Sequence, residues 1–239
     1  MNLSHPSVLA TLSAEELLLW AAEHFASRVA LTCSFGGPGG LVMAHMVSRY
    51  APEIPLIFID TDFLFPETYA MRDLFVQQYG VKVQTFKSQI TPDEQDVLYG
   101  ERLWECDPDA CCQLRKVEPM QRALAKIDAW ICALRRDQSD TRSAVETVEL
   151  HDTANARRIW KINPLAHWTR HQVWDYLVEH QVTLNPLWER GYASLGCIQC
   201  TRLTPPSHTE RSGRWPGSSK KECGLHTFTQ LIHDQPRDW

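Results

Sequence analysis

Short apolar runs of strand length alternate with longer amphipathic segments along most of this 239-residue chain, and this alternation is the feature that most constrains its fold. The segments between the runs have the length and the 3.6-residue period of helices. The apolar runs occur at 29–32, 54–60, 81–86, 127–134 and 158–162. Strands that alternate with helices build βαβ units, so the sequence predicts an α/β fold with a mostly parallel sheet flanked by helices.

Two capping boxes mark the beginnings of predicted helices. Ser13 is followed three residues later by Glu16, and Thr169 is followed by Gln172, each just before an apolar run. In this pattern the two side chains satisfy backbone N–H groups at the start of a helix. Further helices are predicted at 66–79 and at about 110–125, the second kinked or split by Pro119 because proline lacks the N–H group.

The first predicted strand runs into a turn of small residues, CSFGGPGG at 33–40, and a helical segment follows. A strand, a tight turn and the N-terminus of a helix present several backbone N–H groups to one point in space. This arrangement binds anions. The turn is therefore a candidate ligand site, although an ordinary βα turn has much the same composition.

Length and charge limit the classes of function. The chain suits one large domain, or one domain with an extended tail. It has 24 basic and 29 acidic residues, for a net charge of −5, so no overall basic excess favours nucleic acid as a partner. No run of 18 apolar residues is present, and we expect no membrane span. The sequence leaves the oligomeric state open, a homo-oligomer included.

Composition changes from Thr204 onward, where Pro, Gly, Ser and charged residues accumulate. We therefore predict a domain at 1–203 and a mobile C-terminal tail or lid at 204–239. The first residues lack a basic segment followed by an apolar run, which predicts no export signal and a cytoplasmic location. In a reducing compartment the eight cysteines are expected to be metal-binding, catalytic or packing residues.

Four of the cysteines form two pairs that are far apart in the sequence. Cys111 and Cys112 are adjacent, and neighbouring Cα atoms about 3.8 Å apart are too close for the usual disulfide separation of roughly 4.4–6.8 Å. Cys197 and Cys200 form a C-x-x-C pair. Four thiolates are the ligand set of a structural zinc ion or of an iron–sulfur cube. Adjacent ligands favour the cube, while zinc and plain buried thiols remain alternatives.

Cys223 has a different environment. Two lysines precede it and His226 follows three residues later, within a loop-like segment. Positive neighbours lower the pKa of a thiol and increase its thiolate fraction. Cys223 is therefore a candidate nucleophile, with an incidental exposed cysteine as the alternative. The other cysteines, Cys33, Cys106 and Cys132, are predicted to be packing residues.

Several long stretches, together and in this order, resemble the assimilatory adenylyl-sulfate (APS) reductases, which are relatives of the phosphoadenylyl-sulfate (PAPS) reductases in the PP-loop superfamily. The resemblance covers about residues 31–226. The stretches that carry it are IDTDFLFPETY, CCQLRKVEPMQRAL, LRRDQSDTRS, KINPLAHWTRHQVWDYL, NPLWERGYASLGCIQCTR, HTERSGRW and KKECGLH.

The resemblance implies a fold like that of the adenine nucleotide alpha hydrolases, with the nucleotide at the carboxyl ends of the strands. It implies that Cys111, Cys112, Cys197 and Cys200 hold a [4Fe-4S] cluster. It further implies that Cys223 attacks the sulfate sulfur of APS, so that AMP leaves and a Cys-S-sulfonate forms. Thioredoxin or glutaredoxin then releases sulfite for assimilation into cysteine.

An anionic thiolate approaching an anionic substrate needs nearby cations. The family likeness assigns Lys116, Arg142, Arg211 and Arg214 to substrate contacts, and it places His226 beside the nucleophile. Without the likeness, any one of these arginines would be interpreted as a solvated surface charge. The candidates for the adenosine contacts are Ser34, Phe35, Gly36, Asp60 and Thr61.

Two departures from the family pattern concern nucleotide binding. Pro38-Gly39-Gly40 stands where the family turn usually ends near an acidic residue, and Cys132-Ala133 replaces a small-residue-glycine pair. PAPS therefore remains an alternative substrate. A PP-loop tRNA sulfurtransferase is a second alternative, but the S-G-G-x-D-S string of enzymes that split ATP is not in the sequence. A zinc-stabilised binding module is a third, and it leaves the segment around Cys223 unexplained.

Overall fold

The computed structural model describes residues 6–153, 156–204 and 210–232. Within them, one mixed sheet contains the strands β3 (Val83–Lys87), β2 (Leu56–Asp60), β1 (Val29–Thr32), β4 (Ala129–Ile131), β6 (Arg158–Ile162), β5 (Val148–Asp152) and β7 (Gln230–Leu231), in that spatial order. The first five strands are parallel, while β5 and β7 are antiparallel to their neighbours. The predicted α/β class with a mostly parallel sheet is confirmed.

The strand order reverses at β1. The chain passes from β1 to β2 and β3 on one side, then returns to place β4 on the other side of β1. In open α/β sheets, ligands bind in the crevice at the carboxyl ends of the strands, at such a reversal point. The topology therefore directs attention to the ends of β1 and β4.

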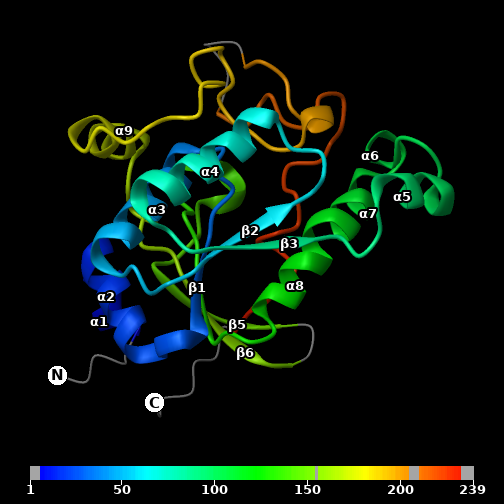
Figure 1. The fold of residues 1–239 in the computed structure, drawn as a ribbon. Helices are drawn as coiled ribbons and strands as arrows, with labels where there is room; N and C mark the ends of the chain where they lie inside the picture. Colours follow the sequence, from blue (N-terminus) through cyan, green and yellow to red (C-terminus); the bar gives the residue numbers. More distant parts are fainter. Residues whose placement is uncertain (1–5, 154–155, 205–209, 233–239) are drawn as a thin grey trace.

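One face of the sheet is covered by helices (Figure 1). Leu31, Leu56 and Phe58 from the central strands pack into the core on this side. The helices that contribute side chains to this core are α1 (Pro6–Leu9), α2 (Ala14–Phe25), α3 (Pro38–Tyr50), α4 (Pro66–Tyr79) and α9 (Arg170–Glu179). Alternate strand residues must point to the opposite face, which needs a second cover.

The second face is covered partly by a helix and partly by the C-terminal segment. Trp130 and Ile57 point to this side, where they pack with α8 (Glu118–Leu124) and with Leu225 and Phe228. Three further short helices, α5 (Pro92–Tyr99), α6 (Leu103–Cys106) and α7 (Pro108–Cys112), lie beyond α8 (Figure 1). The segment predicted as a tail thus supplies part of the sheet's second layer.

The end of this C-terminal segment is held to β5. Gln230 in β7 pairs with Asp152 in β5, and the N–H of Ile232 donates to the carbonyl of Leu150 at 2.9 Å. The buried hydroxyl of Thr229 lies 2.9 Å from Nδ1 of His151. The predicted division at residue 204 stays a prediction, since 205–209 and 233–239 lie outside the described residues and the described part packs on the sheet.

Most predicted elements are present, with some changes at their ends. The bounds of β1, β6 and α4 agree with the predicted ranges, and both capping boxes form as predicted. The predicted strands at 54–60, 81–86 and 127–134 are shortened or shifted at their ends. The predicted helix at 110–125 is split by a π-helical turn, Gln113–Val117, and Pro119, which cannot donate a backbone hydrogen bond, lies directly after this turn in α8. In the part of the chain that the structure describes, no helix is long and apolar enough to span a bilayer.

Candidate active site

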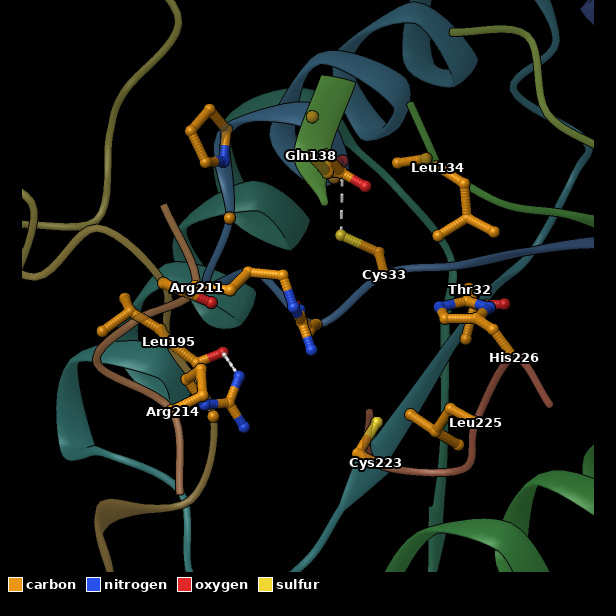
Figure 2. Close-up of a pocket in the computed structure, with 18 of the residues that line it drawn as sticks. Thr32, Cys33, Leu134, Gln138, Leu195, Arg211, Arg214, Cys223, Leu225 and His226 are labelled. Atoms are coloured by element: carbon orange, nitrogen blue, oxygen red, sulfur yellow. Dashed lines mark hydrogen bonds between the residues drawn. The ribbon is translucent and has the colours of Figure 1, made fainter. Parts of the chain in front are cut away.

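A cavity of about 210 Å³ opens at the carboxyl ends of β1 and β4, at the reversal point of the sheet (Figure 2). Thr32 and Cys33 reach it from β1, and Ala133 and Leu134 reach it from the chain after β4. The opposite wall is the loop 193–196 that includes Leu195, together with residues of the C-terminal segment. The position agrees with the expectation from topology.

The N-terminus of α3 forms one side of this cavity. Gly37 to Gly40 line it, and no side chain caps the first N–H groups of the helix. A methyl group on Gly39 would lie 3.4 Å from the carbonyl oxygen of Ala133 and 3.6 Å from Nη1 of Arg135, which are ordinary contact distances, so α3 packs directly against the chain after β4. The positive end of a 13-residue helix therefore faces the cavity and favours an anionic ligand there.

Eight of the predicted catalytic and substrate-binding residues line this cavity. They come from the turn after β1, the end of β2, the π-helical turn, the chain after β4 and the C-terminal segment. These residues are Ser34, Thr61, Lys116, Arg142, Arg211, Arg214, Cys223 and His226. Their assembly from such distant parts of the chain is what a functional site requires, although their individual roles remain proposals.

Three predicted adenosine contacts do not line the cavity. Phe35 has a positive φ of 52° and is fully buried between Phe58 and Phe75. The carbonyl of Gly36 accepts a hydrogen bond at 2.8 Å from the indole of Trp188, which does line the cavity. Asp60 turns away from the cavity to bind Tyr69 and Lys87. The structure therefore brings Ser34 and Thr61 to the site but not these three residues.

The Cys223 thiol lines the cavity and has a lowered pKa. Burial alone would raise its pKa, but the charge of Lys116, the backbone N–H of Leu225 and the charge of Arg214 outweigh that effect and lower the pKa. Lys116 is 6% exposed. Burial works against its charge, but nearby thiolates, Cys197 first among them, raise its pKa, so the ammonium group stays protonated. A lowered thiol pKa in a cavity lined by cations is the environment of a nucleophilic cysteine.

His226 lines the cavity next to Trp130. Its ring stacks on Trp130 at a centroid distance of 5.5 Å, and its carbonyl accepts from Lys161 at 3.5 Å. Burial, with the charges of Arg142 and Lys161, lowers the pKa of His226 well below its usual value. The imidazole is therefore neutral near pH 7, and within the described residues its buried Nδ1 has no hydrogen-bond partner. That nitrogen is available to a ligand in the cavity.

Sequence reasoning missed several residues of the site. Trp130, Gln138, Trp188 and Leu195 line the cavity, and Glu222 pairs with two of its arginines. Gln138, Trp188, Leu195 and Glu222 lie inside stretches that carry the family likeness, so motif position was the available signal. Nothing in the strand around Trp130 distinguished it from a core residue.

A second, smaller cavity joins the two cysteine pairs. Cys111, Cys112, Cys197 and Cys200 all line it, together with Phe63, Trp104, Arg115 and Lys116. The first pair ends α7, and the second lies around a 3₁₀ turn, Ile198–Cys200, that is held to Phe63 by a backbone hydrogen bond of 2.8 Å. The predicted ligand set is thus gathered around one space, and Lys116 lines both cavities.

The donor chemistry of this space fits a group that binds four thiolates. Each of the four cysteines is 6–8% exposed. Burial, and then the neighbouring thiols, raise the pKa of Cys111 to about 12, so four adjacent sulfurs need compensating positive charge. Lys116 and Arg115 are buried beside them. Within the described ranges, no three His, Cys, Asp or Glu side chains have the arrangement of a single-ion site.

The three remaining cysteines differ in burial. Cys33 and Cys132 are buried, as predicted for packing residues. Cys106 is exposed at the end of α6, so its prediction as a packing residue is wrong. It does not line the second cavity, called the thiol cavity below, which the four paired cysteines line.

The fold and the site together define a class: an α/β protein with a cation-lined cavity at the reversal point of its sheet and a thiol of lowered pKa inside it. The sequence profile of the phosphoadenosine phosphosulfate reductase domain matches residues 28–203, and the chain belongs to this family. The family likeness identified from the sequence is confirmed. Because the profile is that of a reductase domain, the tRNA sulfurtransferase and zinc-module alternatives are not retained.

The relatives and solved structures agree with this membership. The chain is 41% identical over 212 residues to an adenosine 5'-phosphosulfate reductase from Halalkalibacterium halodurans, covering 88% of this chain and 90% of the relative. It is 44% identical over 214 residues to one from Streptomyces coelicolor, covering 90% and 88%. The crystal structure of a PAPS reductase from Candida auris in complex with phosphate superposes with a TM-score of 0.71 at 33% identity, over 82% of this chain and 94% of that one.

Proposed function

We propose that this protein is an adenylyl-sulfate reductase that converts APS to sulfite and AMP. The observation that carries the proposal is the Cys223 thiol, whose pKa is lowered by Lys116 and Arg214 inside the cavity at the reversal point of the sheet. Relatives that are 41% and 44% identical over about nine-tenths of the chain carry this name. The proposal also places the protein in a reducing cytoplasm, where the cysteines stay free thiols.

The first step is attack by the Cys223 thiolate on the sulfur of the substrate's sulfate group. The bond from that sulfur to the bridging phosphate oxygen breaks, AMP leaves with the electron pair, and a sulfonate remains on Cys223. Lys116 and Arg214 reduce the repulsion between the thiolate and the anionic substrate. The N-terminus of α3 and the unpaired Nδ1 of His226 are the further groups that this chain offers to the phosphosulfate.

The second step returns Cys223 to the thiol form. A dithiol protein, thioredoxin or glutaredoxin, attacks the Cys223 sulfur, so that sulfite leaves and a mixed disulfide forms. The second thiol of the partner then displaces Cys223, and the two electrons come from the partner's dithiol. This step needs Cys223 to become accessible. The described segment 216–224 lies between attachments at Trp215 and at 225–232, and Gly217 and Gly224 have positive φ values of 80° and 83°. We propose this segment, called the arm below, as the part that moves.

We further propose that Cys111, Cys112, Cys197 and Cys200 hold a [4Fe-4S] cluster. The support is that all four thiols line one buried space, with Lys116 and Arg115 beside them. When bound, such a cluster supplies a fixed charge distribution next to the cavity that contains Cys223. Lys116 lines both cavities, and in this proposal its ammonium group points toward the substrate.

The proposal is tested by measuring sulfite released from APS and, separately, from PAPS, with thioredoxin as reductant. We expect release from APS and a radiolabelled sulfonate on Cys223 when sulfate-labelled APS is added without thioredoxin. Cys223→Ser is expected to keep its iron and to release no sulfite. Turnover by that variant, or label on another residue, contradicts the nucleophile assignment. Preference for PAPS would support the second candidate, which the structural similarity to a PAPS reductase favours.

A further inference from the structure

Glu222, the residue before Cys223, connects the arm to the body of the protein. Its Oε1 accepts from Nε of Arg142 at 3.0 Å, and its Oε2 accepts from Nη2 of Arg142 at 2.9 Å. Oε2 also accepts from Nη2 of Arg211 at 3.1 Å, and Oε1 accepts from the hydroxyl of Thr141 at 3.1 Å. One carboxylate therefore engages two of the three arginines that line the cavity.

The pair with Arg142 is bidentate and largely shielded from water. The side chains of Glu222 and Arg142 are 15% and 12% exposed. Burial alone would raise the pKa of Glu222, but the hydrogen bonds and charges of Arg142 and Arg211 outweigh that effect, so the carboxylate is ionised. Nη1 of Arg142 donates to Gln138 at 2.6 Å, which fixes the guanidinium from its other side. Paired, bidentate contacts of this kind are stronger than surface ion pairs.

The arm is anchored to the body at both ends, by a backbone hydrogen bond before it and by side-chain packing after it. Before it, the N–H of Trp215 donates to the carbonyl of Cys200 at 3.0 Å. After it, Leu225 packs against the second face of the sheet. A further ion pair, Lys220 with Asp109, also links the arm to the body. The Lys220 side chain is 7% exposed, but its partner Asp109 is 84% exposed. Because water screens that pair, the contact at Glu222 is the stronger restraint on the arm.

We propose that Glu222 is a positioning residue that docks the arm on Arg142 and thereby holds Cys223 toward Lys116 and Arg214. In this closed arrangement Glu222 pairs with Arg142 and Arg211 and offsets one of their two positive charges. Lys116 and Arg214 are the cations that act most directly on the Cys223 thiol. The identity of that substrate rests on the proposed function, whereas the docking of the arm does not.

Hydrogen–deuterium exchange of the protein without substrate tests the docking directly. In Glu222→Gln, which keeps size and removes the charge, we expect the amides of residues 216–224 to exchange roughly 10- to 100-fold faster, from the loss of hydrogen bonds between charged groups. Peptides from 226–232 should be unchanged. The matched control is Asp109→Asn, which breaks the exposed ion pair of the same arm and should change exchange by less than about 2-fold. Equal exchange of the arm in wild type and Glu222→Gln overturns the proposal.

Kinetics separate positioning from substrate contact. We expect Glu222→Gln to lower kcat for sulfite release by roughly 10- to 100-fold with KM changed by less than about 3-fold, and Glu222→Asp to restore part of the loss. A rise in KM with unchanged kcat would overturn the positioning role. If the wild-type protein released no sulfite from APS, the proposed function would fail while the exchange result still decided the docking.

Discussion

The glycine before the C-x-x-C pair gives a sharp test of how the cavity activates its thiol. Gly196 lies against the guanidinium of Arg214. A methyl group placed on Gly196 would lie 2.5 Å from Cζ and 2.9 Å from Nη1 of Arg214, and closer still to Nη2. Gly196→Ala therefore cannot keep Arg214 where it is, although the guanidinium is the far end of a flexible side chain and is able to move.

The displacement follows from contact distances. Non-bonded carbon atoms approach to about 3.5 Å, so the guanidinium must retreat by about 1 Å or more. Such a shift breaks the hydrogen bond of 3.1 Å from Nη1 to the carbonyl of Leu195 and disturbs the stacking of Arg214 on Trp215 at 4.6 Å. The Cys223 thiol then loses one of the cations that lower its pKa. Removing one electrostatic contact of this kind costs about 2–3 kcal/mol, so we expect kcat/KM to fall roughly 30- to 150-fold.

The assay is a double-mutant cycle on sulfite release, with iron content measured because Gly196 precedes Cys197. Arg214→Ala alone should lower kcat/KM by at least as much as Gly196→Ala. In the Arg214→Ala background the space for the methyl group is open, and Gly196→Ala should then add less than about 2-fold. Independent, multiplicative losses would refute the reasoning that Gly196 acts through Arg214. Loss of iron from Gly196→Ala would show that the substitution disturbs the thiol cavity instead.

Three further predictions concern other parts of the molecule. Burial and the charges of His180 and Arg49 lower the pKa of His45 from 6.5 to about 4, so its contribution to stability is present above pH 6.5 and is lost as the pH falls toward 4. We expect the unfolding free energy of the wild type to fall by about 2 kcal/mol more than that of His45→Gln between about pH 7.5 and about pH 5, as measured by urea unfolding. The same dependence of unfolding free energy on pH in both proteins would contradict this. Cys197→Ala should lose iron and visible absorbance, while Cys106→Ala, an exposed cysteine, should keep both, and full iron content in Cys197→Ala would show that the ligand set is wrong. Thr229→Val should lower the unfolding free energy by about 1–2 kcal/mol because it leaves Nδ1 of the buried His151 without its partner at 2.9 Å, and an unchanged urea midpoint would contradict that anchor.

Sequence signals were sufficient for much of the sheet and for several residues that line the cavity. The runs that became β1 and β6 are apolar enough to identify strands without tertiary information, and the capping box at Ser13 fixes where α2 begins. Cys223 and Lys116 were found because motif position reports chemistry directly, and both line the cavity.

The remainder depends on contacts between distant residues. β5 was missed because it is not an apolar run: Val148–Asp152 has two apolar residues and three ionisable ones, although Glu149 and His151 are buried. They are stable there because Glu149 pairs with His151 at 2.8 Å and with Lys161 at 3.5 Å. Phe35 was predicted as an adenosine contact together with Ser34 and Gly36, because all three lie in the first turn. Its positive φ directs the ring into the core, and a backbone reversal of that kind is not visible in residue types.

The segment that carries Cys223 continues directly into residues that shield Trp130, a fully buried side chain, and then into the edge of the sheet. Residues 225–232 are therefore not a dispensable extension. A truncation placed just after the nucleophile would strip apolar cover of the sheet as well as interrupting turnover, so its loss of activity would not by itself report on chemistry. Mutational scans of this enzyme should score protein abundance alongside activity, because at its C-terminus the two properties share the same few side chains.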